Sequence, residues 1–172
     1  MMSNEPPQGA QSADPVRVKT LQVKVRPQHW AWLDAAAIEA NFVWNYANEL
    51  CHKAAKPFAG PGKWLSGFDV VNLMAGAHRE FAHLTQATIN KIAIEHGNKR
   101  QTARRTRLSW RKSGGTRRSL GWVPFRDGQI RVKGGAVLFA GQRFRVFDSY
   151  GLGDHKVVAG SFSQNALGEW FL

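Results

Sequence analysis

Residues 16–26 read VRVKTLQVKVR and are followed by Pro27. Apolar and polar side chains alternate, so Leu21, Val23 and Val25 share one face of an extended chain. This period of two predicts a half-buried β-strand, which the proline ends. Because the residues after it have helical spacing, the strand stands alone, and we expect it to join a sheet built from the end of the chain.

The block that follows is predicted to be helical. Its first helix has apolar residues at helical intervals. Four aromatic residues widen this apolar surface, as expected of a helix inside a bundle. They are Trp30, Phe42, Trp44 and Tyr46. The stretch KPFAGPGKW (56–64) breaks this helix. Ser66 and Asp69 start a second helix in the manner of a capping box, and we expect it to reach about Phe81. A third helix is expected to begin near Thr85 and to continue to about residue 112.

From residue 117 the period of the pattern returns to two. Asp127-Gly128 lies between apolar runs and predicts a hairpin turn, and Gly134-Gly135 predicts another turn. Short strands are expected at 119–126, 129–133, 136–139, 142–148, 155–162 and 169–172. Strands of this length and spacing predict a small antiparallel β-barrel.

We therefore predict an α+β fold, in which a helical bundle is inserted after the first strand of a small OB-like antiparallel β-barrel. The expected parts are a disordered tail (1–15), the first strand (16–27), the helical insertion (28–112) and the rest of the barrel (113–172). The tail lacks the apolar stretch of a signal peptide, and no apolar run approaches the about 20 residues of a membrane span. Cys51 is the single cysteine, so we expect no disulfide and an intracellular location.

Charge is concentrated in residues 98–118, NKRQTARRTRLSWRKSGGTRR, which hold nine Lys or Arg and no Asp or Glu. The whole chain has 24 Lys and Arg against 12 Asp and Glu, a formal net charge of +12. Without this basic segment the excess falls to three. An excess of positive charge confined to one segment is typical of a surface that binds a polyanion. The alternative is a solvated basic surface without a partner.

Four arginines of the basic segment are spaced for one face of a helix. Like charges at this spacing destabilise a helix, and a phosphate backbone would relieve the repulsion. Basic residues also alternate along the later strands beside aromatic residues, a combination that holds phosphates and stacks on bases. Trp122 could instead belong to the core. The candidate nucleic-acid-binding residues are Arg100, Arg104, Arg105, Arg107, Arg111, Lys112, Arg117, Arg118, Trp122, Arg126, Arg143 and Arg145.

Residue types that could carry catalysis are present but are not arranged for it. There is no P-loop, and Gly151 and Gly153 lack the third glycine and the following helix of a dinucleotide site. The six histidines have no metal-ligand spacing, and the twelve carboxylates are scattered. We therefore expect no catalytic residue, no metal site and no cofactor in this chain.

Several stretches together resemble the N-terminal half of the TnpB proteins of IS200/IS605 transposons, relatives of the compact Cas12 effectors of CRISPR systems. They are FVWNYANEL (42–50), the helix start at 66–73, TQATINKIAIE (85–95), SLGWVPFR (119–126), GQRFRVFDS (141–149) and GSFSQNALGEWFL (160–172). The resemblance covers about residues 18–172. In that family a small wedge barrel carries a recognition domain inserted after its first strand.

The resemblance implies a part in RNA-guided DNA targeting in a prokaryotic cytoplasm or nucleoid. The wedge domain and basic linker would hold the guide RNA, and the recognition helices would read a motif in double-stranded target DNA. In the family a RuvC nuclease domain that uses Mg²⁺ follows. We expect that domain to be separate or missing here, and hence no nuclease activity from these 172 residues. The positions that would read the DNA motif are Asn72, Gln86, Thr88 and Asn90.

Two other functions fit the same residues. One is an unguided DNA- or RNA-binding regulator, and the other is an RNA-binding barrel with a helical interaction insert. For Gln86 and Asn90, a polar helix face over solvent is the alternative to base contact. The sequence departs from the family at Gly67, where the family often has a tyrosine. Because of this difference, the DNA motif cannot be predicted from the resemblance.

Overall fold

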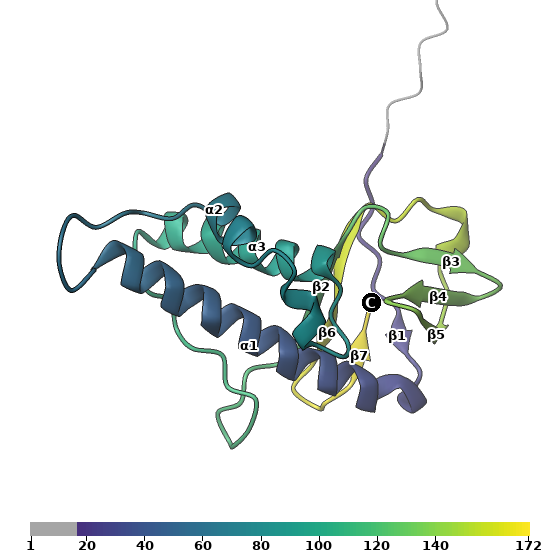
Figure 1. Cartoon of the computed structure of the whole chain (residues 1–172). Coiled ribbons are helices and arrows are strands. Elements are labelled where there is room, and N and C mark those ends of the chain that lie inside the picture. The colour runs from purple at the N-terminus through teal and green to yellow at the C-terminus, as the bar shows by residue number, and fades with distance from the viewer. Residues whose placement is uncertain (1–16) are drawn as a thin grey trace, which may run out of the picture.

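The computed structural model describes residues 17–172, and the predicted tail lies outside this described part. The fold is α+β, with three α-helices between the first strand and the remaining strands (Figure 1). The prediction of a helical insertion after the first strand is therefore confirmed. The helices are α1 (Trp30–Ala55), α2 (Gly67–Leu73) and α3 (Gln86–Ala103), with short 3-10 turns at Pro27–His29, Ala77–Glu80 and Leu152–Asp154.

Seven strands of the described part form one antiparallel sheet in the order β2-β6-β7-β1-β5-β4-β3. They are β1 (Lys24–Val25), β2 (Trp122–Arg126), β3 (Arg131–Lys133), β4 (Ala136–Phe139), β5 (Gln142–Phe147), β6 (Ala159–Gln164) and β7 (Trp170–Phe171). Lys24 is paired with Phe147 on one side and with Phe171 on the other. The lone first strand therefore joins the two halves of the sheet, although its regular pairing is shorter than 16–26.

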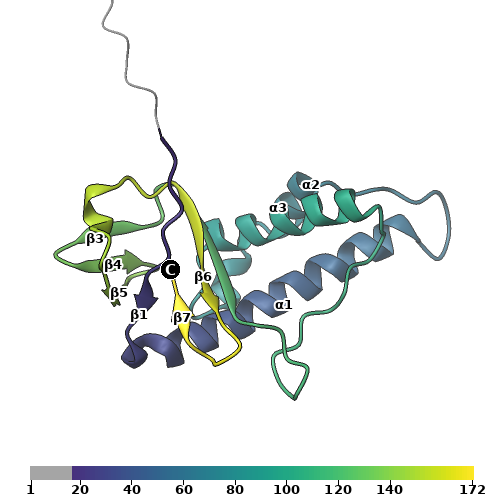
Figure 2. The ribbon, with the colours of Figure 1, turned by 180° about the vertical axis from the view of Figure 1, so that it is seen from behind.

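The sheet is a curled, open half-barrel rather than the predicted closed barrel, with β2 and β3 at its two edges (Figures 1 and 2). The hairpin predicted at Asp127-Gly128 is wrong, because β2 pairs with β6 and β3 pairs with β4. The turn itself forms, with Gly128 at φ 80°. However, Gln129 Nε2 donates to the hydroxyls of Thr85 and Thr88, both at 3.1 Å. The turn is thereby anchored to the start of α3, and the two strands separate there.

Local signals start two of the helices where the sequence predicted. Ser66 Oγ accepts from the Asp69 N–H at 3.2 Å, and Asp69 Oδ2 accepts from the Ser66 N–H at 2.8 Å, so the capping box is present. Thr85 caps α3 by accepting from the Thr88 N–H at 3.3 Å. The second helix is shorter than predicted, because the chain turns at Gly76 with φ 82°.

The core lies between the inner face of the sheet and the helices. Phe125, Phe139, Phe144 and Phe162 are buried, with centroids of contacting rings 5.1–6.3 Å apart. Trp170 of β7 is fully buried, and its Nε1 donates to Asp34 Oδ1 of α1 at 2.9 Å. This packing fixes the start of α1 against the sheet and carries the rest of the helix outward (Figure 1).

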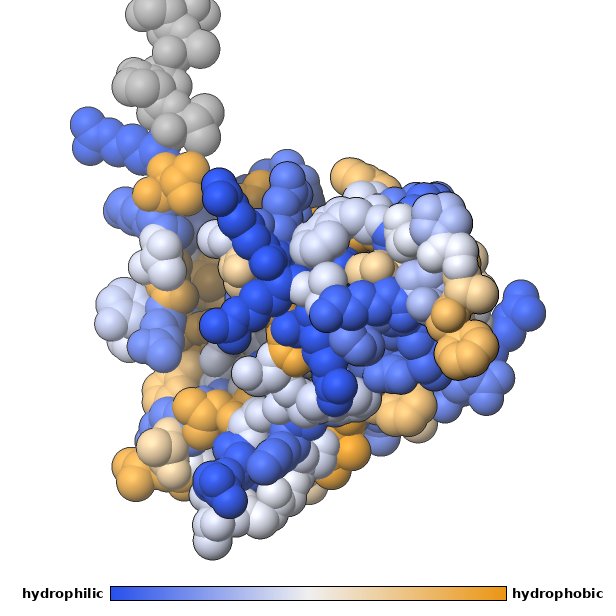
Figure 3. Space-filling model, turned by 90° about the vertical axis from the view of Figure 1, so that its left-hand side faces the viewer, coloured by the Kyte–Doolittle hydropathy of each residue, from blue (hydrophilic) through white to orange (hydrophobic). Residues whose placement is uncertain are grey.

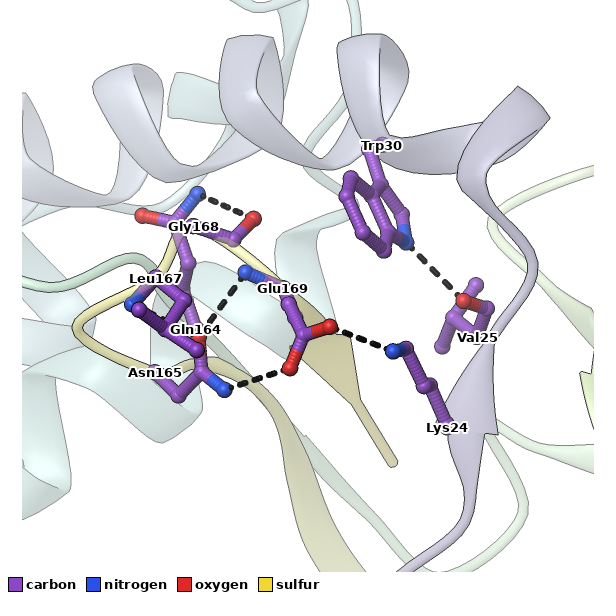
Figure 4. A network of polar contacts seen from close by, with 8 residues as sticks. All are labelled: Lys24, Val25, Trp30, Gln164, Asn165, Leu167, Gly168 and Glu169. Atoms are coloured by element: carbon purple, nitrogen blue, oxygen red, sulfur yellow. Dashed lines mark hydrogen bonds and ion pairs between the residues drawn. The ribbon is translucent and has the colours of Figure 1, made fainter.

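A polar network ties the last strand to β1 (Figure 4). Asn165 Oδ1 accepts from the Leu167 N–H at 3.0 Å and from the Glu169 N–H at 2.9 Å, which shapes the turn before β7. The Glu169 carboxylate then pairs with Lys24 Nζ on β1. The Lys24 and Asn165 side chains lower the pKa of Glu169 by hydrogen bonding. Part of the stretch 160–172 thus has a structural role at the centre of the sheet.

Candidate nucleic-acid interface

Beyond Ala103 the basic segment is not helical. α3 ends at Ala103, and Arg104 takes a left-handed conformation with φ 50°. Residues 104–121 contain no regular helix or strand. The prediction of one helical stripe of arginines at positions 100, 104, 107 and 111 is therefore wrong.

Three asparagines of α1 hold the basic segment instead. Asn48 Oδ1 accepts from the Leu108 N–H at 2.8 Å, and Asn48 Nδ2 donates to Leu108 O at 2.7 Å. Asn45 makes the same pair of bonds with Arg111, both at 2.8 Å. Asn41, one turn earlier, donates to a serine hydroxyl further along. Residues three and four apart share one helix face, and the amides of Asn45 and Asn48 satisfy backbone groups that a longer α3 would have paired internally.

Arg100 is buried, so it is not available for a nucleic acid. Its side chain lies fully inside, and its guanidinium is 4.1 Å from the centroid of the Trp64 ring. Arg100 Nη1 donates to Leu65 O at 3.0 Å. Among residues 17–172 no carboxylate pairs with it. Arg100 therefore fastens the loop before α2 onto α3, and the prediction of a surface contact is wrong for it.

Arg111 is also used within the fold. Its Nη2 donates to Leu120 O at 2.7 Å, and its Nε donates to Asn41 Oδ1. Its guanidinium lies 5.6 Å from the Trp122 ring centroid, and burial lowers the pKa of Arg111. These contacts close the loop between residues 111 and 120 and leave little of the guanidinium for a partner.

The other basic side chains of the segment are exposed. They are Lys99, Arg104, Arg105, Arg107, Lys112, Arg117 and Arg118. Within the described part none of them forms an ion pair with Asp or Glu. Figure 3 views the end of the molecule where α1 and α3 finish, and hydrophilic side chains cross the middle of that face. Such a group of uncompensated cations attracts polyanions.

Two of these cations lie over tryptophan rings. Lys99 Nζ is 5.4 Å from the Trp44 ring centroid, and the Arg107 guanidinium is 5.1 Å from that of Trp110. Trp122 is half-buried and meets Trp44 edge-on, with centroids 6.2 Å apart. Trp122 therefore packs in the fold, which agrees with the alternative stated above that it belongs to the core.

A second basic group lies on the sheet. Arg26, Arg143 and Arg145 are exposed and line a pocket of about 340 Å³ together with the turn at 134–135. Arg26 was not predicted from the sequence, and it reaches this group because its N–H donates to Arg145 O at 2.9 Å, beyond the end of β1. Figures 1 and 2 place β5 at the opposite end of the molecule from the tip of α1. Arg126, another predicted contact, ends the edge strand β2 and is exposed.

Two of the four residues expected to read a DNA motif are engaged inside the fold. Thr88 is fully buried, so the prediction that it reaches a base edge is wrong. Gln86 Oε1 accepts from the Gly76 N–H at 3.0 Å, and Gln86 Nε2 donates to Asn90 Oδ1 at 2.8 Å. These bonds tie the start of the 3-10 turn at Ala77–Glu80 to α3 and occupy the Gln86 amide. Asn72 on α2 is exposed.

Replacing Asn48 with leucine should release part of the basic segment from α1. The N–H and C=O of Leu108 would lose their partner, and an unpaired buried polar group costs about 1–3 kcal/mol, so we expect a loss of about 2 kcal/mol in stability. Hydrogen exchange should show faster exchange at Leu108, while α1 stays protected. Asn72→Leu, on an exposed asparagine, is the matched control. Unchanged protection of Leu108 would show that other contacts hold the segment.

Comparisons with known protein families and with curated proteins gave no match. Within residues 17–172 no three His, Cys, Asp or Glu side chains form a group that could hold a metal ion. No helix in this range has the length and apolar character needed to cross a membrane.

Proposed function

We propose that this chain binds RNA and that the basic segment is the surface that holds it. The observation that supports this most strongly is the group of seven exposed cations between residues 99 and 118 that have no carboxylate partner in the described part. A phosphate backbone supplies the missing counter-charges, and its condensed counterions are released on contact. The proposed role is binding, without catalysis.

The tryptophans favour RNA over an intact DNA duplex. Trp110 is 42% exposed among the cations of the segment, and Trp44 lies beside Lys99. Proteins that recognise RNA commonly stack aromatic side chains on bases that leave a loop, bulge or single strand. A regular DNA duplex keeps its bases inside, where these rings would have no partner.

The resemblance to TnpB proteins supports a narrower version of the proposal. In this version the half-barrel is an OB-like wedge, the helices between β1 and β2 are the recognition domain, and the bound RNA is a guide. Double-stranded target DNA would then contact the helices, where Asn72 is exposed. The competing function is an unguided regulator that binds RNA or DNA without one defined RNA.

Changing Arg104, Arg105 and Arg107 to glutamine should flatten the dependence of RNA affinity on salt. Each lost phosphate contact removes about 0.7 to 0.9 from the slope of log K against log salt concentration, so we expect a total change of about 2 to 3. RNA titrations at several KCl concentrations measure the slope. In the described structure none of these three side chains donates a hydrogen bond to the fold, so stability should be preserved.

The control removes the same charge from scattered exposed positions, in the variant Lys56→Gln, Arg79→Gln, Lys133→Gln. An equal change of slope in both variants would mean that net charge alone attracts RNA, and the proposed surface would be wrong. Sequencing the RNA that co-purifies with the chain distinguishes a guide-RNA-binding protein from an unguided regulator. One recurrent RNA supports a guide, whereas mixed cellular RNA supports the unguided regulator.

A further inference from the structure

An open pocket of about 620 Å³ lies between the end of α3 and residues 108–111, the part of the basic segment that follows the helix. Trp44 from α1 and Trp110 from the basic segment line it, and α3 contributes Lys99 and Thr102. Its wall is more apolar than polar, although the surrounding chain is the most basic part of the sequence. Its volume falls within the about 300–1,000 Å³ of ordinary ligand sites. An apolar, aromatic pocket among cations fits a ligand with a flat ring and an attached negative charge.

The side chains at the pocket match the parts of a nucleotide. The indole of Trp110 is partly exposed and offers a stacking surface for a base. The Arg107 guanidinium lies over one face of that ring, 5.1 Å from its centroid, so a base would stack on the other face and Arg107 would reach the phosphate of the same nucleotide. Asn98 is exposed on α3, lines the pocket, and has no hydrogen-bond partner for its amide within residues 17–172. An unengaged amide can donate to and accept from the edge of a base.

We infer that this pocket receives the base of one unpaired RNA nucleotide, which stacks on Trp110 while Lys99 and Arg107 contact its flanking phosphates. The inference rests on the proposed RNA-binding function and narrows it, because the RNA must present an unpaired base at this point. Stacking accepts every base, since each has a flat π-face. The site therefore distinguishes unpaired from paired RNA more strongly than it distinguishes one base from another.

The test compares Trp110→Ala with the wild-type chain on a short unstructured RNA and on the same RNA annealed to its complement. Affinity for the unstructured RNA should fall about 5- to 150-fold, the equivalent of one lost base–aromatic stack. Affinity for the duplex should not change. Thr102→Trp, which fills the pocket from α3, should have the same effect without changing charge. Phe58→Ala removes a fully exposed aromatic residue outside the pocket and should leave both affinities unchanged.

An equal loss of affinity for both RNAs would overturn the inference, because Trp110 would then only position the basic segment. The inference would also be overturned if both pocket variants bound unstructured RNA as tightly as the wild-type chain does. In that case the proposed function would still stand, provided that the chain bound RNA with a steep salt dependence. Adenosine monophosphate tests the free nucleotide as the other source of the same chemistry. If the chain bound this nucleotide through Trp110 but bound neither RNA, the proposed function and the RNA-specific inference would both be wrong.

Discussion

The Trp170→Ala variant should be less stable than the wild-type chain by about 3–5 kcal/mol, a large share of the stability of a typical domain. Trp170 is fully buried and bonded to Asp34 of α1. Its ring also lies against Gly121, where an added Cβ would come within 2.4 Å of the indole. Removing the ring would leave a cavity where β7, α1 and the start of β2 meet.

Urea unfolding followed by circular dichroism measures this effect, with the free energy extrapolated to water. Trp110→Ala is the matched control, since it removes the same side chain from an exposed site and should cost far less. Trp170→Phe should fall between the two, because it keeps an aromatic ring but loses the N–H that bonds Asp34. A wild-type unfolding midpoint for Trp170→Ala would show that this contact between sheet and helix is not a main part of the core.

Acid should destabilise the fold through His96. This residue is fully buried on α3, and its pKa is lowered from 6.5 to about 4 by burial and by the nearby charge of Arg100. Asn48 Oδ1, which accepts from the Leu108 N–H, lies 3.3 Å from His96 Nε2, so the neutral ring donates through Nε2. No partner in the described part contacts its Nδ1.

The sign of the pH effect follows from the lowered pKa. Between pH 6.5 and about pH 4 the unfolded chain binds a proton at His96 that the folded chain does not. Stability should therefore be full above pH 6.5 and fall towards pH 4, by about 1.4 kcal/mol per pH unit and about 3 kcal/mol in total.

Unfolding curves at several pH values for the wild-type chain and for His96→Gln test this expectation. Glutamine stays neutral and keeps a donor for Asn48, so the stability of the variant should fall much less over the same range. The comparison cancels the contribution of His29, whose pKa is lowered by burial and by Arg145. Parallel curves for the two proteins would show that His96 does not cause the acid sensitivity.

The parts of the fold predicted from sequence are those that depend on short-range patterns. The capping box at Ser66 and the cap at Thr85 use groups three residues apart, so the local sequence contains all that is needed. The burial of Val23 and Val25 follows from their alternation with polar residues. The Asp127-Gly128 turn was also recognised, but its neighbours found partners elsewhere in the sheet, which a local pattern cannot show.

The candidate site was predicted in composition but not in geometry. Its charge is visible in the sequence, and seven of its nine basic residues are exposed in the structure. The helical spacing of its arginines was misleading, because Asn45 and Asn48, far away in sequence on α1, bond the backbone of Arg111 and Leu108 and so hold the segment outside a helix. Arg26 was missed because only strand pairing brings it beside Arg145.

By itself, the sequence determined the order of strands and helices, the concentration of positive charge in residues 98–118, and the alternation that buries one side of the first strand. Only the tertiary structure decided which arginines face solvent. Arg100 packs on Trp64, and Arg111 holds the return of the chain at Leu120. Whether a cation is free depends on which backbone carbonyls and rings lie within a few ångströms, and long-range packing brings those groups together.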